Sequence, residues 1–173
     1  MKKIFTILVA VFSAHLLQAN NIQVSNINVS QPNISFTISW ENSWNTTNNI
    51  NPLYPNNWDG AWVFIKYQNN IDNLWKHATV SSINTDHTIT GGILQIESVA
   101  DGMGIFIRRS NPGSGTVTAS VTLKMNALTG TGNFNFKVFG TEVVNIPQSN
   151  FQLGDGNFGG ANYFTTQDIT AAK

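Results

Sequence analysis

Four aromatic residues lie close together in one asparagine-rich stretch of this 173-residue sequence. Trp44, Tyr54 and Trp58 fall within residues 41–60, ENSWNTTNNINPLYPNNWDG, and Trp62 follows directly. Aromatic faces stack on the C–H groups of sugars and asparagine amides pair with sugar hydroxyls, so this composition is typical of a carbohydrate-binding surface. The alternative, which we favour, is structural: the tryptophans fold inward and each indole N–H donates to a carbonyl. The four residues are nevertheless the candidate ligand-binding residues of the chain.

Residue types that could perform catalysis are sparse. His77 lies in the segment WKHATV, where a period of two places it on the same face as Trp75 and makes it a structural or surface histidine. Asp86 and His87 are neighbours in a polar turn, and adjacent residues cannot form a hydrogen-bonded triad. The same three polar residues lack the spacing of a metal centre. We therefore expect no catalytic residue, no bound metal and no cofactor.

Strands must position these residues, because the dominant hydrophobic period is two. The segments NISFTISW, TVTASVTL and GNFNFKVFG all alternate apolar with polar residues, which is typical of strands with one buried face. Further strands are predicted near residues 24–29, 61–67, 74–80, 93–99, 103–108 and 141–146. The predicted core residues are Phe36, Trp40, Val63, Ile65, Phe106, Val121 and Phe136. Residues 41–60 are predicted to be a loop, longer than structureless loops usually are.

Turn residues separate these apolar segments. The pair Asp101-Gly102 stands between two of them and predicts a hairpin. No stretch after the first nineteen residues has the 3.6-residue period of a helix. Eight or nine short strands predict an all-β fold, an antiparallel β-sandwich of immunoglobulin-like type, with a closed barrel as the alternative.

The N-terminus has the composition of a secretory signal peptide. Residues 1–19, MKKIFTILVAVFSAHLLQA, begin with Lys2 and Lys3, continue with an apolar run and end on the small residue Ala19. This helical segment is too short for a membrane span, and no second apolar run follows, so the mature chain is expected to have none. We predict export to the periplasm, the cell surface or the medium. Because the chain has no cysteine, its core must stabilise it without disulfides.

The charge of the chain is low and dispersed. The full sequence has 9 basic and 9 acidic residues, so removal of Lys2 and Lys3 leaves 7 basic and 9 acidic residues, a net charge of −2. Asparagine, with 24 copies, is the abundant polar residue. A neutral surface of this kind argues against nucleic acid as a partner.

Four phrases occur in an order that is informative as a set: WENSW (40–44), PNNWDGAWVFIKY (55–67), WKHATV (75–80) and DGMGIFIRR (101–109). Together they resemble the N-terminal β-module of exported proteins from Bacteroidota-type bacteria. In those proteins the module precedes a formylglycine-generating, sulfatase-modifying-factor-like domain. The closing phrase EVVNIPQSNFQLGDG resembles the start of that second domain, although Asn145 and Ser149 stand where an aromatic residue and a glycine are more usual.

The resemblance implies three parts: a signal peptide at 1–19, a β-sandwich module at 20–146, and the start of a following domain or a mobile tail at 147–173. It implies a non-catalytic, exported module that supports or docks the downstream domain, or contacts a cell-surface partner. The alternative function is a carbohydrate-binding module that uses the aromatic residues of 41–62 to bind a glycan. An enzyme in its own right, with a site at His77 and His87, is the third reading.

Overall fold

The structure, a computed structural model, describes residues 21–46 and 57–145 together with two short strands at 151–153 and 167–169. The predicted signal peptide and Tyr54 lie outside the described residues. In the described part the chain forms antiparallel strands and one three-residue 3₁₀ turn, η2, at Asn84–Asp86. The strands are β1 Gln23–Ser30, β2 Asn33–Asn45, β3 Trp58–Asn69, β4 Trp75–Ala78, β5 Thr88–Ile89, β6 Leu94–Ser98, β7 Ile105–Arg109, β8 Gly113–Lys124, β9 Phe134–Asn145, β10 Phe151–Leu153 and β11 Gln167–Ile169.

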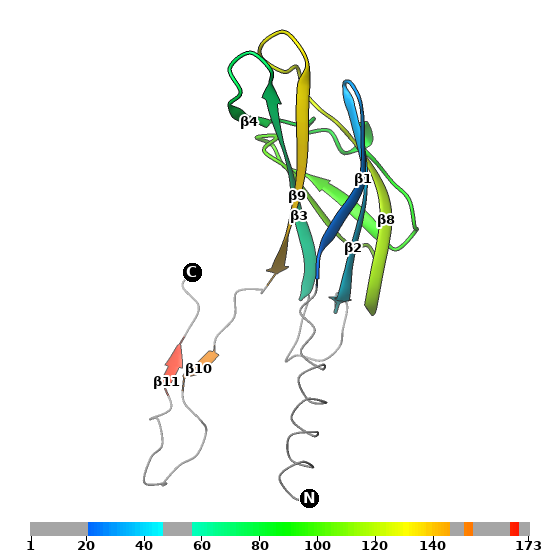
Figure 1. Cartoon of the computed structure of the whole chain (residues 1–173). Helices are drawn as coiled ribbons and strands as arrows, with labels where there is room; N and C mark the ends of the chain where they lie inside the picture. The colour runs from blue at the N-terminus through cyan, green and yellow to red at the C-terminus, as the bar shows by residue number, and fades with distance from the viewer. Residues whose placement is uncertain (1–20, 47–56, 146–150, 154–166, 170–173) are drawn as a thin grey trace, which may run out of the picture.

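The first nine strands form one sheet that folds over into two layers (Figure 1). In the first layer β2 pairs with β1 on one edge and with β8 on the other, and β8 continues to β5. In the second layer β3 pairs with β9 on one edge and with β4 and β7 on the other, and β7 continues to β6. The layers are joined by the pair Asn45–Trp58. The predicted antiparallel β-sandwich is confirmed.

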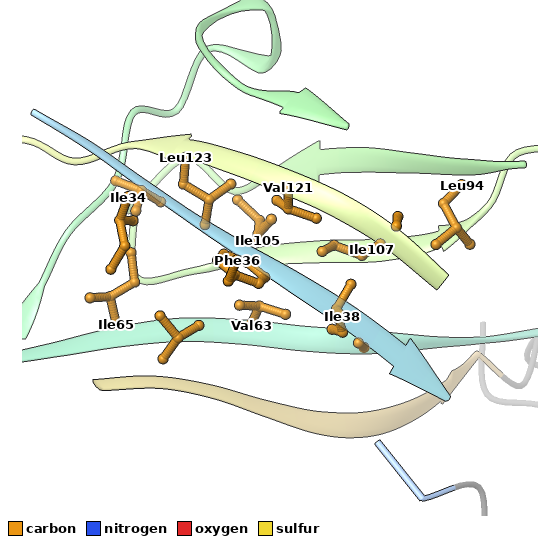
Figure 2. Close-up of a cluster of buried hydrophobic side chains, with 14 of the residues drawn as sticks. Ile34, Phe36, Ile38, Val63, Ile65, Leu94, Ile105, Ile107, Val121 and Leu123 are labelled. Atoms are coloured by element: carbon orange, nitrogen blue, oxygen red, sulfur yellow. The ribbon is translucent and has the colours of Figure 1, made fainter. Parts of the chain in front are cut away.

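The hydrophobic core lies between the two layers. Figure 2 shows side chains of β2 and β8 pointing toward those of β3 and β7. Five of the predicted core residues are at most 2% exposed, as their alternation required, and Phe136 is partly buried against the core. The five are Phe36, Trp40, Val63, Ile65 and Val121.

The prediction that Phe106 is a core residue was wrong. In β7 the inward positions belong to Ile105 and Ile107, which are both fully buried. Because side chains alternate along a strand, Phe106 must point to the opposite, solvent-facing side. There its ring lies 4.7 Å from the ring of Trp62, centroid to centroid.

Two predicted strand boundaries also differ from the structure. Residues 141–146 are not a separate strand, because β9 runs without a break through Gly140, whose missing side chain makes room for β1. A Cβ at that position would lie 3.1 Å from Ile22 Cγ2. The predicted loop 41–60 is shorter, because β2 passes a bulge after Trp40, where Asn42 takes a φ of 55°, and continues to Asn45.

The predicted hairpin at Asp101-Gly102 is confirmed. β6 and β7 pair in antiparallel register, and the connecting turn is closed by Gly102 N–H, which donates to Val99 O at 3.1 Å. Gly102 has a φ of +64°, which glycine adopts without strain. Within the predicted third part, 147–173, β10 and β11 pair as a separate two-stranded sheet, and the other residues lie outside the described part.

Candidate functional site

The solvent face of the second layer carries a group of aromatic residues that we call the aromatic strip. It consists of Trp58, Trp62 and Phe64 of β3, Trp75 of β4, Phe106 of β7 and Phe139 of β9. The strip arises from the alternation of β3, in which Ala61, Val63 and Ile65 point into the core and are fully buried. Trp62 and Phe64 take the opposite face and remain half-buried. The segment AWVFIKY is therefore apolar on both faces of an antiparallel sheet.

Ring contacts connect the strip across neighbouring strands. Phe64 and Phe139 stack at a centroid distance of 5.1 Å with 12° between their planes. The imidazole of His77 lies parallel to Phe64 on the other side, at 6.0 Å. Its Nε2 also lies 2.7 Å from Met103 O, so His77 is held in place by a ring contact and a backbone contact. Contacts of this type stabilise aromatic pairs beyond their buried area.

A cation lies over the tryptophan ring at each end of the strip. The Arg108 guanidinium lies 4.8 Å from the ring centroid of Trp58, and the Lys137 ammonium lies 4.5 Å from that of Trp75. Arg108 also forms an ion pair with Glu97 of β6. These cation–π contacts cover one face of each tryptophan. In the described part of the chain, a cation therefore covers the tryptophan at each end of the strip, and the residues between these ends are aromatic.

Gly104 gives the Trp62 indole its position. A Cβ at Gly104 would lie 2.6 Å from Trp62 Cζ2 and 2.6 Å from Val63 O, so no larger residue fits there without a shift. The backbone just before β7 therefore lies directly against the indole. This close approach fixes Trp62 beside Phe106, in the middle of the strip.

A buried polar network lies at the other face of β3, where the two layers join. The carboxylate of Asp59, which is fully buried, accepts hydrogen bonds from Trp40 Nε1 at 2.9 Å, Ser43 Oγ at 3.1 Å and the Trp44 backbone N–H at 2.6 Å. Arg109, 7% exposed, donates from Nε to the same Ser43 Oγ at 3.2 Å. The network ties together the end of β2, the start of β3 and the end of β7.

The structure brings together only two of the four candidate ligand-binding residues. Trp58 and Trp62 both belong to the aromatic strip of β3. Trp44 is half-buried on β2 and pairs with Ser114 of β8, in the other layer, while Tyr54 lies outside the described residues. Trp40 was not a candidate residue. Its indole N–H nevertheless makes the kind of buried hydrogen bond that was expected of the tryptophans in 41–60.

Sequence reasoning missed most of the strip. Phe64 stands two residues after Trp62 on β3, and Phe106, Trp75 and Phe139 come from three further stretches of sequence that only strand pairing makes neighbours. One signal was available. A strand with one wet face should carry polar residues at every second position, and AWVFIKY carries aromatic residues there instead.

The candidate residues Asp86 and His87 form a small cluster with Ser81 and Lys124, and its contacts are structural. His87 is buried, its Nε2 lies 2.8 Å from Ser81 O, and its Nδ1 accepts the Lys124 backbone N–H at 3.2 Å. Ser81 Oγ donates to Asp86 Oδ2 at 2.6 Å, and Lys124 Nζ lies 3.1 Å from the same oxygen. The backbone thus occupies both ring nitrogens of His87. Within the described ranges, no group of three or more His, Cys, Asp or Glu residues could hold a metal ion.

This cluster predicts a pH dependence. The hydrogen bond from Ser81, followed by that from Lys124, lowers the pKa of Asp86 below its ordinary value of 3.8. A carboxylate with a lowered pKa stabilises the fold above its unfolded-state pKa, and this stabilisation is lost as the pH falls through the folded-state pKa. We expect Asp86→Asn to have a lower urea midpoint than wild type at neutral pH, with a gap that closes below pH 3.8. A gap of constant size down to strongly acidic pH would contradict this assignment.

The comparisons with known proteins identify no relative. No protein-family model matches the chain, and no curated protein or solved structure is significantly similar to it. Among the described residues, no helix has both the length and the apolar character needed to cross a membrane.

Proposed function

We propose that the chain is an exported, non-catalytic β-sandwich module that docks a protein partner through its aromatic strip. Following the resemblance, the partner is a downstream formylglycine-generating-like domain or another cell-surface protein. One observation carries the proposal: four strands place six aromatic residues on the solvent face of one layer, outside the core. Trp75 and Phe139 are each 41% exposed. Aromatic residues gathered on a solvent face support an interaction site there.

Protein docking fits the strip better than sugar stacking. A sugar needs a free aromatic face, but Arg108 and Lys137 already cover a face of Trp58 and of Trp75. The ring of Trp62 is held between Phe106 and the backbone at Gly104. Protein interfaces, by contrast, are enriched in aromatic residues and arginine. The carbohydrate-binding alternative remains a second candidate for this face, supported by Trp58 and Trp62 on the same strand.

The polar groups of the fold support a module without activity of its own. Both nitrogens of His87 contact backbone atoms, and the buried Asp59 carboxylate is occupied by three donors of its own chain. A general base needs a free position toward its substrate. Neither residue has one.

Phe139→Lys is the variant that tests docking. Phe139 is exposed and lies on the edge strand of the strip, so a lysine there leaves the core intact and puts a charge into the interface. A formylglycine-generating-like domain that naturally follows such a module is titrated onto the chain, and tryptophan emission is recorded. We expect wild type to bind and Phe139→Lys to bind at least tenfold more weakly, because the interface would bury a charge that has no partner.

The matched control is Thr118→Lys, which adds the same charge to an exposed position of β8 on the first layer. It should bind as wild type does. Equal weakening by both variants, or no binding by wild type, would count against docking through the strip. Circular dichroism of each variant establishes that the sandwich is folded.

A further inference from the structure

A row of three basic side chains crosses the aromatic strip, one on each of the adjacent strands β4, β3 and β9 (Figure 1). Lys66 of β3 lies directly opposite His77 of β4 on one side and Lys137 of β9 on the other. We call these three residues the basic row. Residues directly opposite in antiparallel strands share a face of the sheet. Phe64 stands two positions before Lys66 on β3, so the basic row lies on the solvent face that carries the strip.

No acidic residue stands beside the two lysines on this face in the described part of the chain. The same-face positions around Lys66, one strand across or two residues along, carry aromatic, amide and basic side chains. They are Phe64, Gln68, Trp75, His77, Asn135, Lys137 and Phe139. Glu142 of β9 pairs with Ala61, whose side chain points into the core, and therefore takes the opposite face. The positive charge of the basic row is thus not balanced locally.

The other basic residues of the described part are matched within the chain. Three of them form ion pairs: Lys76 with Asp72, Arg108 with Glu97 and Lys124 with Asp86. Arg109 donates hydrogen bonds to Ser43 and to the Gly115 carbonyl. Among the described residues Lys66 has neither a hydrogen bond nor an ion pair, and Lys137 contacts the ring of Trp75. These two ammonium groups are therefore available to a carboxylate from another molecule.

A partner that covers the exposed rings of the strip must also cover both lysines. Trp75 stands two positions before His77 on β4, and Phe139 stands two positions after Lys137 on β9. Because β4 and β9 both run antiparallel to β3, the two rings lie on opposite sides of the basic row. An interface that buries both rings therefore removes water from the lysines between them. Burying a charge without a partner is costly, so the partner has to supply carboxylates there.

We propose that the partner of the aromatic strip is a protein with an acidic docking surface, whose carboxylates pair with Lys66 and Lys137. Apolar side chains beside those carboxylates cover Trp75 and Phe139. This inference rests on the docking proposed above and adds the chemistry of the partner. It agrees with the weaker binding expected of Phe139→Lys, because the carboxylates already matched to two lysines leave none for a third.

An anionic polysaccharide is the competing occupant of this face. The exposed rings on both sides of the basic row favour a protein, because a polysulfate has few apolar groups with which to cover them. The ammonium of Lys137 is also held 4.5 Å from the ring centroid of Trp75 before any partner binds, so less ordering is required on binding.

The test is a titration of the full chain with two short peptides, one a repeat of Leu-Glu-Glu and the other a repeat of Leu-Gln-Gln, and with heparin. Binding is followed by backbone amide NMR shifts. We expect the acidic peptide to bind at least threefold more tightly than the glutamine peptide and to shift the signals of 64–68, 75–77 and 135–139. Raising sodium chloride from about 0.1 M to about 1 M shortens the Debye length from about 10 Å to about 3 Å and should remove this difference.

Lys66→Gln and Lys137→Gln should each weaken binding of the acidic peptide roughly threefold, as for one partly exposed ion pair. Neither variant should change binding of the glutamine peptide. Lys124→Gln is the matched control, because it removes the same charge from β8 in the first layer, and it should bind both peptides as wild type does. Circular dichroism establishes that each variant is folded.

Three results would overturn the proposal: equal binding of the two peptides, binding of neither, or shifts of the strip signals by heparin but not by the acidic peptide. The formylglycine-generating-like domain separates this inference from docking itself. Equal affinity of that domain for wild type, Lys66→Gln and Lys137→Gln would support docking and overturn the acidic partner. No binding of the domain, with the acidic peptide bound at the strip, would overturn that domain as the partner and support the acidic surface.

Discussion

Asp59→Ala is expected to lower the free energy of unfolding by about 3–5 kcal/mol, the cost of breaking a buried charged network. The carboxylate is fully buried and accepts hydrogen bonds from Trp40, Ser43 and the Trp44 backbone. Its removal leaves these donors unsatisfied, including Ser43 Oγ, which also accepts the hydrogen bond from Arg109 Nε. The urea midpoint should fall by roughly 2 M, given an m-value of about 2 kcal/mol/M.

Two further variants distinguish the network from a general effect of removing a charge. Asp59→Asn keeps the size of the side chain but replaces one acceptor oxygen with a donor, so it should also be strongly destabilising. Asp72→Ala removes an exposed carboxylate that pairs with Lys76, and it should shift the midpoint far less. An Asp59→Ala midpoint within the error of the Asp72→Ala value would show that the network is not needed for stability.

Gly104→Ala is expected to have the second largest effect, about 2–3 kcal/mol, as for overpacking of a rigid contact. The new methyl group would lie 2.6 Å from both Trp62 Cζ2 and Val63 O, and the carbonyl cannot move without disturbing β3. The backbone at residue 104 must therefore move away from the Val63 carbonyl, and the Trp62 ring must leave its present position. We expect a lower urea midpoint together with a red shift of the tryptophan emission, because the displaced indole becomes more exposed.

A double-mutant cycle identifies the cause. Trp62→Ala removes the ring that the new methyl group meets, so Gly104→Ala should cost less in the Trp62→Ala background than in wild type. The matched glycine control is Gly92→Ala. Gly92 has a φ of +74° with open space around its would-be Cβ, so the stability lost in Gly92→Ala comes from the backbone conformation alone. This variant should leave the tryptophan emission unchanged. Additive effects of Gly104→Ala and Trp62→Ala would contradict the close approach.

The sequence predicted the strands of the two layers more reliably than it predicted which side chains of those strands point into the core. A period of two in NISFTISW and TVTASVTL placed β2 and β8 correctly, because burial on one face and solvent on the other impose that period. The same reasoning failed at Phe106. In IFIRR both Ile105 and Phe106 are apolar, and only the register of β7 on β3 decides that the isoleucines point inward.

The candidate site was predictable only in part. Trp58 and Trp62 lie in one segment that stood out by composition, and both reach the aromatic strip. Phe139 joins Phe64 through a strand pair that spans more than seventy residues of sequence, a contact that no local pattern encodes. The role of Asp59 was equally hidden, since its three donors become neighbours only after the bulge in β2 has turned Ser43 and Trp44 toward β3.

The most direct test of docking is hydroxyl-radical footprinting of the native protein, compared with the isolated chain. We expect peptides carrying Trp62, Phe64, Trp75 and Phe139 to label more slowly in the native protein. Peptides from the solvent face of β8 should label equally in both. Equal labelling of the strip in the native protein and in the isolated chain would contradict docking through the strip, because the strip would then face solvent in the native protein.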